Sequence, residues 1–450
     1  MADLRALLSE EALREWLPRQ RWFASKTRDV AEVTLVDVLE LADDPPTAIG
    51  LIEARFHAGT HELYQLLLGV ERGRVAFDAL TSRPHAAVVA GLLAGNAVAP
   101  STAGTIEFHW LDGAPALPAD PPVRPMGAEQ SNTTVVIDER VALKAFRRLE
   151  PGKNPELEML RFLAARAFPN IAALWGWYEL TGETLSTTLG IAQELVVGGR
   201  DGWELALDEL GSDPDRFLAR LGELGEVVGT MHALLGSDAS DPDFAPEPST
   251  PEGLSLMTAT IDEEIERIFL RLPEDDPVVA PILGRGEEIR DRLQAMSHAG
   301  EGGRLIRNHG DLHLGQTLRT HGRDGRWVIL DFEGEPARPV TDRRRKRSPL
   351  RDVAGMLRSF AYAASASAVQ RGNPVPADWE QRARDAFLDG YLSHVDANLL
   401  PPGPSAIHSL LGIYELEKAV YELRYELDNR PDWIEVPVAG VERILSEPIA

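Results

Sequence analysis

The sequence of 450 residues contains no cysteine. Structural disulfides, thiolate nucleophiles, iron–sulfur clusters and cysteine-ligated zinc are therefore excluded, because each of them needs a cysteine sulfur. Long apolar runs are also missing, and no stretch approaches the ~18 uninterrupted apolar residues that mark a membrane-spanning helix. The first twenty residues lack the apolar core of a signal peptide. From these absences we expect a cytoplasmic protein with no membrane partner.

Positive charge is scarce as well. The chain has 46 Lys and Arg residues against 71 Asp and Glu residues, which gives a net charge of −25. Nucleic acids and anionic membranes present phosphate, so we expect neither as a partner of the general surface. The hydrophobic content of 44% and charged content of 26% are typical of a globular protein. At roughly 100–200 residues per domain, the length predicts two to four folding units.

The first 90 residues have the pattern of a small α+β domain. Short helices are expected at Glu10–Trp16 and at 85–94. Turn signals separate three strand-like stretches, which are Val33–Leu41, Thr47–Phe56 and His61–Val70. No catalytic chemistry is visible in residues 1–90.

Residues 91–200 predict a β-rich lobe with a single helix. A proline-rich connection at 114–125 precedes the lobe. Asn154 is the expected N-cap of the helix, and Pro155 suits the first helical position. The expected strands are Thr133–Ile137, Val141–Phe146, Trp175–Leu180, Thr184–Leu189 and Ile191–Val197.

From residue 201 to residue 450 the apolar residues recur with the period of a helix. The expected helices are Arg216–Leu235, Leu254–Leu272, Pro281–Met296, Pro349–Val369, Trp379–Val395 and Ser405–Leu427. A β-rich lobe followed by a helical lobe is the outline of a bilobal phosphotransferase. The predicted fold class is therefore α+β, kinase-like, with an extra N-terminal domain. An outline does not establish a function.

Two motifs in the helical half carry the chemistry. Protein kinases have a catalytic loop H-R-D-x-x-x-x-N, followed after a short strand by Asp-Phe-Gly. Here Asp311 precedes Gln316 by five positions, and Asp331 follows the apolar strand Trp327–Leu330. Phosphoryl transfer needs a carboxylate to accept a hydroxyl proton and oxygen ligands to hold Mg²⁺. We predict Asp311 as the catalytic base, and Gln316 and Asp331 as Mg²⁺ ligands.

An ATP-binding lysine should lie upstream, and Lys144 fits this role. It sits in Val-Ala-Leu-Lys, which is similar to the kinase strand whose lysine contacts the α- and β-phosphates. Its ion-pair partner should lie on the following helix. We predict Glu158, because it lies deeper in the helix and shares a face with Phe162. Glu156, closer to the helix start, remains a rival.

The sequence has no Gly-rich phosphate loop. The stretch from Gly127 to Thr134 stands in its place, at the entry to the first strand of the β-rich lobe. Small and hydroxyl-bearing residues there can cradle phosphate with backbone N–H groups and side chains. The predicted ATP contacts are Gln130, Ser131, Asn132 and Thr133. An ordinary Ser/Thr turn is an equally good interpretation of this stretch alone.

The last predicted helix contains a candidate acceptor site. Four residues share one of its faces at spacings of 4, 3 and 4, and they are Tyr414, Lys418, Tyr421 and Tyr425. A neighbouring stripe is acidic and consists of Glu415, Glu422 and Glu426. Aromatic faces beside carboxylates hold sugars, whose ring faces stack while their hydroxyls form hydrogen bonds. On periodicity alone, packing of the helix onto its lobe is an equally good explanation.

Six stretches of the chain resemble the actinobacterial maltokinases, and together they run nearly from end to end. They are 20–26, 127–132, 146–152, 309–316, 331–339 and 348–358. The family's fold resembles that of aminoglycoside phosphotransferases. The resemblance implies an N-terminal cap domain (1–90), an intermediate ATP-binding domain (91–200) and a helical catalytic and sugar-binding lobe (201–450).

The resemblance also implies a reaction. Maltokinases transfer the γ-phosphoryl group of ATP, with Mg²⁺, to the anomeric hydroxyl of maltose. The product, α-maltose 1-phosphate, feeds α-glucan synthesis from trehalose-derived maltose, so the resemblance implies an association with a maltose-forming trehalose synthase. Carried onto this sequence, the sugar contacts are His313, Tyr421, Glu422, Tyr425, Arg430 and Trp433. The segment 196–203 departs from the family pattern, which leaves the adenine contacts open.

Two alternatives remain. A glucosamine kinase of the same superfamily shares the His-Gly-Asp-Leu-His loop but has a final helix less rich in Tyr-Glu pairs. A catalytically inactive kinase fold could serve as a regulatory module, but it would have lost a base or a metal ligand, and all of these residues are present here.

Overall fold

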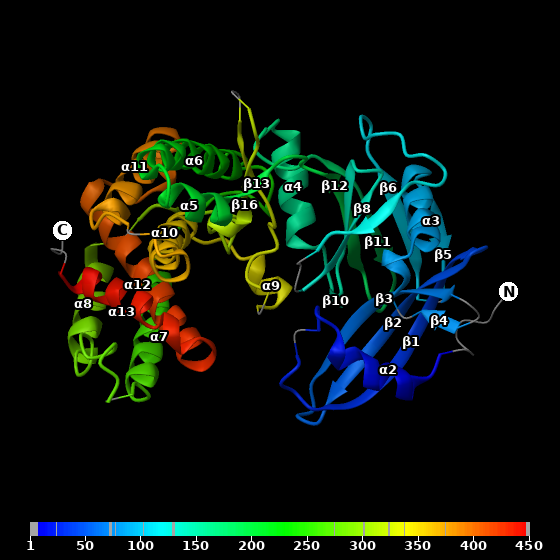
Figure 1. Cartoon of the computed structure of the whole chain (residues 1–450), viewed down its shortest axis with the longest axis horizontal. Coiled ribbons are helices and arrows are strands. Elements are labelled where there is room, and N and C mark those ends of the chain that lie inside the picture. The colour runs from blue at the N-terminus through cyan, green and yellow to red at the C-terminus, as the bar shows by residue number, and fades with distance from the viewer. Residues whose placement is uncertain are drawn as a thin grey trace. The chain divides into compact units, whose positions relative to one another are not determined.

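A computed structural model of the chain divides into two compact units (Figure 1). The first unit comprises the chain up to Ala164 together with 171–197 and 336–343, and the second comprises 165–170, 198–335 and 344–450. The structure describes residues 8–23, 25–71, 74–76, 78–101, 103–127, 131–273, 275–299, 302–322, 325–336, 338–373 and 375–446.

One sheet of the first unit is antiparallel and is buried on both faces. Its path is β1-β2-β3-β10, and β4 also pairs with β3. Alternate residues of a strand point to opposite faces. Accordingly Ile49 and Leu51 of β2 join one hydrophobic cluster, whereas Ala48 and Ile52 join another. The strands are β1 (Val30–Asp43), β2 (Pro46–Phe56), β3 (His61–Glu71), β4 (Arg74–Ala76) and β10 (Arg148–Leu149).

The second sheet of this unit has seven strands in the order β5-β6-β11-β12-β9-β8-β7. Helix α3 (Arg83–Ala94) contacts strands of both sheets, and the two sheets share one hydrophobic cluster. Because β10 also pairs with β3, the core continues across the boundary expected near residue 90. That boundary stays a prediction. The strands are β5 (Val98–Pro100), β6 (Thr105–Trp110), β7 (Val123–Pro125), β8 (Thr133–Ile137), β9 (Val141–Ala145), β11 (Leu174–Thr181) and β12 (Thr187–Glu194).

One strand prediction in this sheet was wrong. The expected strands 184–189 and 191–197 are a single strand, β12, with Gly190 in its middle. A Cβ at Gly190 would collide with the ring of Tyr178 and the backbone of Lys144. Glycine here therefore permits a close approach between strands rather than a break.

Helices α2 and α4 begin at the residues that the sequence predicts, whereas α3 begins at Arg83, two residues before the expected start. Ser9 accepts a hydrogen bond from Ala12 N at the start of α2 (Glu10–Trp16). Asn154 Oδ1 accepts one from Glu156 N at 2.8 Å, at the start of α4 (Pro155–Ala165). A short helix, α9 (Val340–Arg343), also belongs to this unit.

The second unit is mainly helical. Its helices are α5 (Gly202–Leu210), α6 (Pro214–Leu235), α7 (Pro251–Phe269), α8 (Gly286–Ala299), α10 (Leu350–Arg371), α11 (Trp379–His394), α12 (Pro404–Asn429) and α13 (Glu435–Ser446). Helices α6 and α11 run side by side (Figure 1). Gly225 and Gly390 make this approach possible, because a Cβ at either would collide with the opposite backbone. Among the described residues, no helix has the length and apolarity to cross a membrane.

Helix α13 was not predicted. The last helix expected from the sequence ends before Trp433, but α13 follows it and contacts α8, α10 and α12. Two small sheets complete the unit. The first has the order β13 (Arg200–Asp201), β16 (Thr317–Arg319), β17 (Trp327–Ile329), and the second pairs β14 (Glu247–Pro248) with β15 (Arg304–Leu305).

Candidate functional site

The loop that contains Asp311 is fixed by a buried carboxylate. Asp352 of α10 accepts hydrogen bonds from His309 N at 2.7 Å and from Gly310 N at 2.9 Å. The same carboxylate lies 3.1 Å from His232 Nε2 on α6. Burial acts to raise the pKa of Asp352, but the hydrogen bond and the charge of His232 outweigh burial and lower that pKa. An ionised carboxylate thus holds the backbone just before Asp311.

His309 joins the two kinase-like motifs. Its Nε2 lies 2.7 Å from Leu330 O, and its Nδ1 accepts a hydrogen bond from Asp311 N at 3.3 Å. Only the neutral tautomer with the proton on Nε2 satisfies both contacts. The ring also packs on Phe332, with the ring centroids 5.0 Å apart. His309 therefore sets the spacing between the loop and the segment that follows β17.

The two predicted metal ligands lie together. Gln316 Nε2 is 3.3 Å from Asp331 Oδ2, and Leu330 N donates to Gln316 O at 2.9 Å. A carboxylate oxygen of Glu333 lies within 4.8 Å of one of Asp331. Asp331 has a φ of +58°, a left-handed conformation that a non-glycine residue adopts at a cost. Amide and carboxylate oxygens are the ligands that Mg²⁺ prefers, so this donor set fits such an ion.

A network of charges surrounds the predicted base. Lys418 Nζ on α12 lies 3.9 Å from Asp311 Oδ1 and 3.6 Å from Glu335 Oε1. Arg351 on α10 contacts Glu335 at 3.1 Å and Glu417 at 3.3 Å. Asp311 and its acidic neighbours therefore already have cationic partners within the chain.

His313, a predicted sugar contact, forms a hydrogen bond within its own loop. Its Nδ1 accepts a hydrogen bond from Gly315 N at 3.1 Å. Burial lowers the pKa of His313, and the charge of Asp311 opposes this shift only in part. We therefore expect a neutral imidazole. Its contact with sugar stays a prediction.

The aromatic face of α12 is open at its C-terminal half. Tyr421 is 46% exposed and Tyr425 is 43% exposed, whereas Tyr414 is buried. Arg430 lies over the rings of Tyr425 and Trp433, at 5.1 and 5.7 Å from their centroids. Five of the six predicted sugar contacts, all except His313, thus lie near the C-terminal end of α12.

The acidic stripe of α12, in contrast, is buried in ion pairs. Glu422 accepts hydrogen bonds from Arg358 Nε at 2.9 Å and Nη2 at 2.7 Å. Glu426 pairs with Arg430, and Glu415 pairs with Arg384 and Arg443. These carboxylates attach α12 to its neighbours. The contact of Glu422 with sugar stays a prediction.

In the first unit, the partner of Lys144 differs from the prediction. Lys144 Nζ on β9 donates to Glu156 Oε2 at 2.9 Å, so Glu156 replaces Glu158 as the ion-pair partner. Residues two positions apart on a helix point about 200° apart, so the two side chains leave α4 on nearly opposite sides. The face shared with Phe162 did not distinguish Glu158 from Glu156, because the first six residues of α4 are all buried.

Residues of the predicted phosphate loop form hydrogen bonds with a buried arginine that lies outside the loop. Arg147, which is 1% exposed, donates from its backbone N to Asn132 Oδ1 and from Nε to Thr133 Oγ1. It also pairs with Asp78 at 2.6 Å. Asn132 Nδ2 lies 3.4 Å from Ser131 Oγ, and Gln130 lies outside the described residues. Contacts of these residues with ATP remain predictions.

Sequence reasoning missed the residues that support the site. Asp352, His232, Arg351 and Glu335 come from distant segments, and no local pattern connects them to Asp311. A signal existed for Arg351, Asp352 and Glu335, since they lie in the stretches 348–358 and 331–339 that resemble the maltokinases. That resemblance gave none of them a role.

The fold and this arrangement of base, amide and second carboxylate define a phosphotransferase of the kinase type. Residues 122–392, more than half of the chain, match the phosphotransferase enzyme family, and the chain belongs to this family. Residues 16–96 match the maltokinase N-terminal cap domain. These matches confirm the predicted fold class and the resemblance to maltokinases.

The curated relatives of this chain share less than 30% sequence identity with it. The chain is 27% identical over 339 residues to a glucosamine kinase of Streptacidiphilus jiangxiensis, which covers 71% of this chain and 72% of the relative. It is 26% identical over 344 residues to a glucosamine kinase of Mycolicibacterium smegmatis, covering 72% and 80%. A solved glucosamine kinase in complex with glucosamine, ADP and inorganic phosphate has a TM-score of 0.72 at 23% identity, covering 96% of this chain and 99% of that chain. The structural match shows a shared fold.

Proposed function

We propose that this protein is a maltokinase, which transfers the γ-phosphoryl group of ATP to the anomeric hydroxyl of maltose and yields ADP and α-maltose 1-phosphate. The match of residues 16–96 to the maltokinase cap domain is the observation that favours maltose. The contact between Gln316 and Asp331, and the hydrogen bonds by which His309 connects the Asp311 loop to Leu330, support phosphoryl transfer to a hydroxyl. The product, α-maltose 1-phosphate, would enter α-glucan synthesis.

The proposed mechanism assigns one task to each group. Asp311 orients the anomeric hydroxyl and accepts its proton as the oxygen bonds to phosphorus. Lys144 contacts the α- and β-phosphates and is oriented by Glu156. Gln316 and Asp331 would hold Mg²⁺, which when bound neutralises the charge of the phosphate oxygens. Lys418 Nζ lies 3.9 Å from Asp311 Oδ1 and places a positive charge beside the base.

Glucosamine is the second candidate acceptor, because both curated relatives are named glucosamine kinases. The ammonium group of glucosamine would form an ion pair with a carboxylate in the acceptor site. Around Asp311, however, the carboxylates of Glu335 and Glu417 are already paired with Arg351. Lys418 adds a further positive charge next to the base. This arrangement favours a neutral sugar.

An ADP-release assay over a panel of sugars tests the proposal. The panel contains maltose, glucose, glucosamine, trehalose and a kanamycin-type aminoglycoside, each with ATP and Mg²⁺. We expect the highest kcat/KM for maltose, and phosphorus NMR should place the new phosphate on the anomeric oxygen. Turnover of glucosamine without maltose would replace the proposal by the second candidate. ATP binding without turnover of any sugar would favour an inactive regulatory module.

The ion pair of Lys144 gives one prediction. Glu156→Gln should lower kcat/KM for ATP about 10–100-fold, because a charge-assisted hydrogen bond contributes about 1.5–3 kcal/mol. Steady-state kinetics with varied ATP measure the change. Glu158→Gln is the matched control on the same helix and should have a smaller effect. A larger loss in the Glu158 variant would contradict the assignment.

The exposed tyrosines of α12 give another prediction. Replacement of Tyr421 and Tyr425 together by Ala should raise the KM for maltose about tenfold with little change in kcat, because each stacked ring contributes roughly 0.5–1.5 kcal/mol. The double Phe variant retains the rings and should stay close to the wild type. An unchanged KM in the double Ala variant would show that the tyrosines only pack.

A further inference from the structure

A lysine beside the predicted base has hydrogen-bond donors that no residue of the described chain uses. Lys418 Nζ lies 3.9 Å from Asp311 Oδ1 and 3.6 Å from Glu335 Oε1, and both distances are too long for a hydrogen bond. Among the described residues, Lys418 has no other ion pair and no hydrogen bond. Its side chain is only 16% exposed. An ammonium group with three donors is therefore largely buried without a hydrogen-bond acceptor.

The neighbouring cation, Arg351 of α10, is already bound. It donates to Glu335 at 3.1 Å and to Glu417 at 3.3 Å, and its side chain is 6% exposed. The side chain of Asp311, in contrast, accepts no hydrogen bond from the residues that the structure describes. Lys418 and Asp311 are therefore a positive and a negative group whose hydrogen-bonding capacity is left for a substrate.

A glycine brings this lysine and the catalytic loop to the same point of α10. A Cβ at Gly355 would lie 2.7 Å from the carbonyl oxygen of Leu312, the residue after Asp311, and 3.8 Å from Lys418 Cε. The missing side chain at Gly355 thus leaves room for both the loop and the lysine stem. Because the stem packs on α10, the ammonium group has few alternatives to its place beside Asp311.

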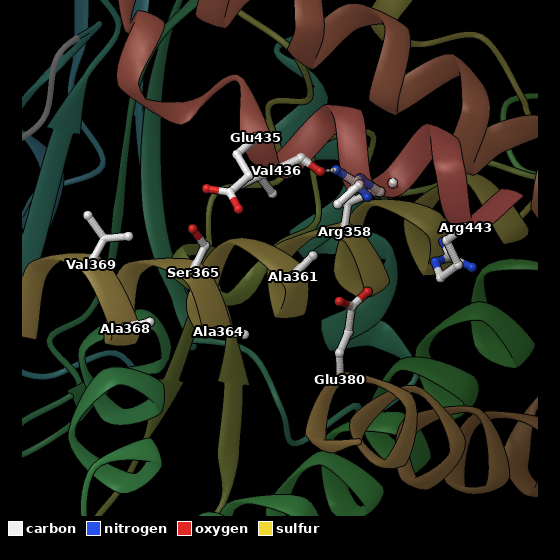
Figure 2. A pocket seen from close by; sticks show the side chains of 12 residues that line it. Arg358, Ala361, Ala364, Ser365, Ala368, Val369, Glu380, Glu435, Val436 and Arg443 are labelled. Atoms are coloured by element: carbon white, nitrogen blue, oxygen red, sulfur yellow. Dashed lines mark hydrogen bonds between the residues drawn. The ribbon is translucent and has the colours of Figure 1, made fainter. Parts of the chain in front are cut away.

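Helix α12 is fixed again one turn after this lysine. Glu422 follows Lys418 by four residues on the same face, and Arg358 of α10 donates to Glu422 at 2.7 and 2.9 Å. Arg358 also donates to Val436 O, and Figure 2 shows it between α10 and α13 at the wall of a pocket of about 390 Å³. Neither Lys418 nor Asp311 lines that pocket. The pairing of Arg358 with Glu422 therefore keeps the face of α12 that carries Lys418 against α10.

The proposed reaction brings negative charge to this ammonium group. A general base lies about 2.6–3.2 Å from the hydroxyl oxygen whose proton it accepts, and the reacting atom lies roughly 3–3.5 Å from that oxygen. A phosphoryl group that reaches the hydroxyl bound by Asp311 therefore comes close to Lys418 Nζ. The charge of the transferred group is spread over its three outer oxygens, and a cation placed in advance at those oxygens lowers the barrier.

We propose that Lys418 is a catalytic residue of this reaction, a role that rests on the proposed function, and that it donates hydrogen bonds to the transferred phosphoryl group. Asp311 takes the hydroxyl proton, the sugar oxygen bonds to the γ-phosphorus, and the bond from that phosphorus to the bridging oxygen of ADP breaks. Lys418 keeps its own protons throughout. It binds the group that moves, whereas Lys144 binds the phosphates that leave with ADP.

Lys418→Met tests this contact, because methionine has a stem of similar length and no charge. We expect kcat to fall about 100-fold, the lower end of the loss caused by removing one preorganised donor, with both KM values within about threefold of the wild type. Lys418→Arg retains the charge and should recover about a tenth of the wild-type kcat. Lys26→Met, the same change at an exposed lysine, is the control and should leave kcat unchanged. A raised KM for the sugar with an unchanged kcat in Lys418→Met would overturn the proposal.

A transition-state analogue separates this contact from support of Asp311. Fluoroaluminate imitates the transferred phosphoryl group when it binds together with ADP, Mg²⁺ and the acceptor sugar. Calorimetric titration measures how much fluoroaluminate strengthens the binding of ADP. We expect Lys418→Met to lose most of that gain while it binds ADP alone as the wild type does. A gain equal to that of the wild type would mean that Lys418 acts only through Asp311, and the proposed contact would be wrong.

The acceptor in these measurements is the sugar that the wild type phosphorylates fastest. Turnover of glucosamine in place of maltose would overturn the proposed acceptor alone, because the effect of Lys418→Met can then be measured with glucosamine. Full activity of Lys418→Met beside an active wild type would overturn the role of Lys418 alone. Absence of turnover with every sugar in the wild type would overturn both.

Discussion

Asp311→Asn is expected to lower kcat for maltose phosphorylation by about 10²–10⁴-fold, the range that general-base catalysis contributes. Asparagine has nearly the same shape but cannot accept the hydroxyl proton. The backbone of the loop should keep its place, because Asp352 and His309 bind it through main-chain atoms. Coupled ADP release with saturating ATP and maltose measures the change, and scanning calorimetry reports the Tm.

The matched control is Asp291→Asn, the same change at an exposed position of α8. It should leave both kcat and Tm unchanged. If Asp311→Asn kept more than a tenth of the wild-type kcat, Asp311 would not be the base. A loss of kcat accompanied by a large fall in Tm would instead indicate a structural role for this side chain.

The sequence predicted most elements of the fold because their signals are local. The expected strand Thr133–Ile137 and helix Glu10–Trp16 agree with β8 and α2 residue for residue. The misses have tertiary causes. Gly190 suggested a break in a strand because its tight packing against Tyr178 cannot be seen in one dimension. No helix was expected after Trp433, where α13 (Glu435–Ser446) lies.

The candidate site was predictable where one short segment positions it. Asp311 and Gln316 lie in one loop, and His309 ties that loop to the segment of Asp331. The choice between Glu156 and Glu158 required the orientation of α4 toward β9, which the sequence does not contain. The support from Asp352 was invisible for the same reason, since 42 residues separate it from Gly310.

The hydrogen bonds of Asp352 to the loop before Asp311 lead to the second prediction with a large expected effect. Asp352→Ala should destabilise the protein by about 3–5 kcal/mol, because it removes a buried carboxylate and leaves the backbone N–H groups of His309 and Gly310 and the ring of His232 without their partner. At roughly 2–4 °C per kcal/mol, the Tm of the second unit should fall by about 6–20 °C. The kcat should fall as well, even at temperatures where the variant is folded, because the loop before Asp311 loses its anchor. Asp389→Ala, at an exposed site on α11, is the control.

The pH dependence of the Tm shows whether Asp352 supports the loop by its charge or only by packing. Because the folded pKa of Asp352 lies below its ordinary value of about 3.9, its ionised form stabilises the protein fully above that pH. The contribution is lost as the pH falls through the lowered folded pKa. The difference in Tm between wild type and Asp352→Ala should therefore be constant from about pH 5 to 8 and shrink below about pH 4. A difference that stayed the same in acid would mean that Asp352 supports the loop by filling space and not by its charge.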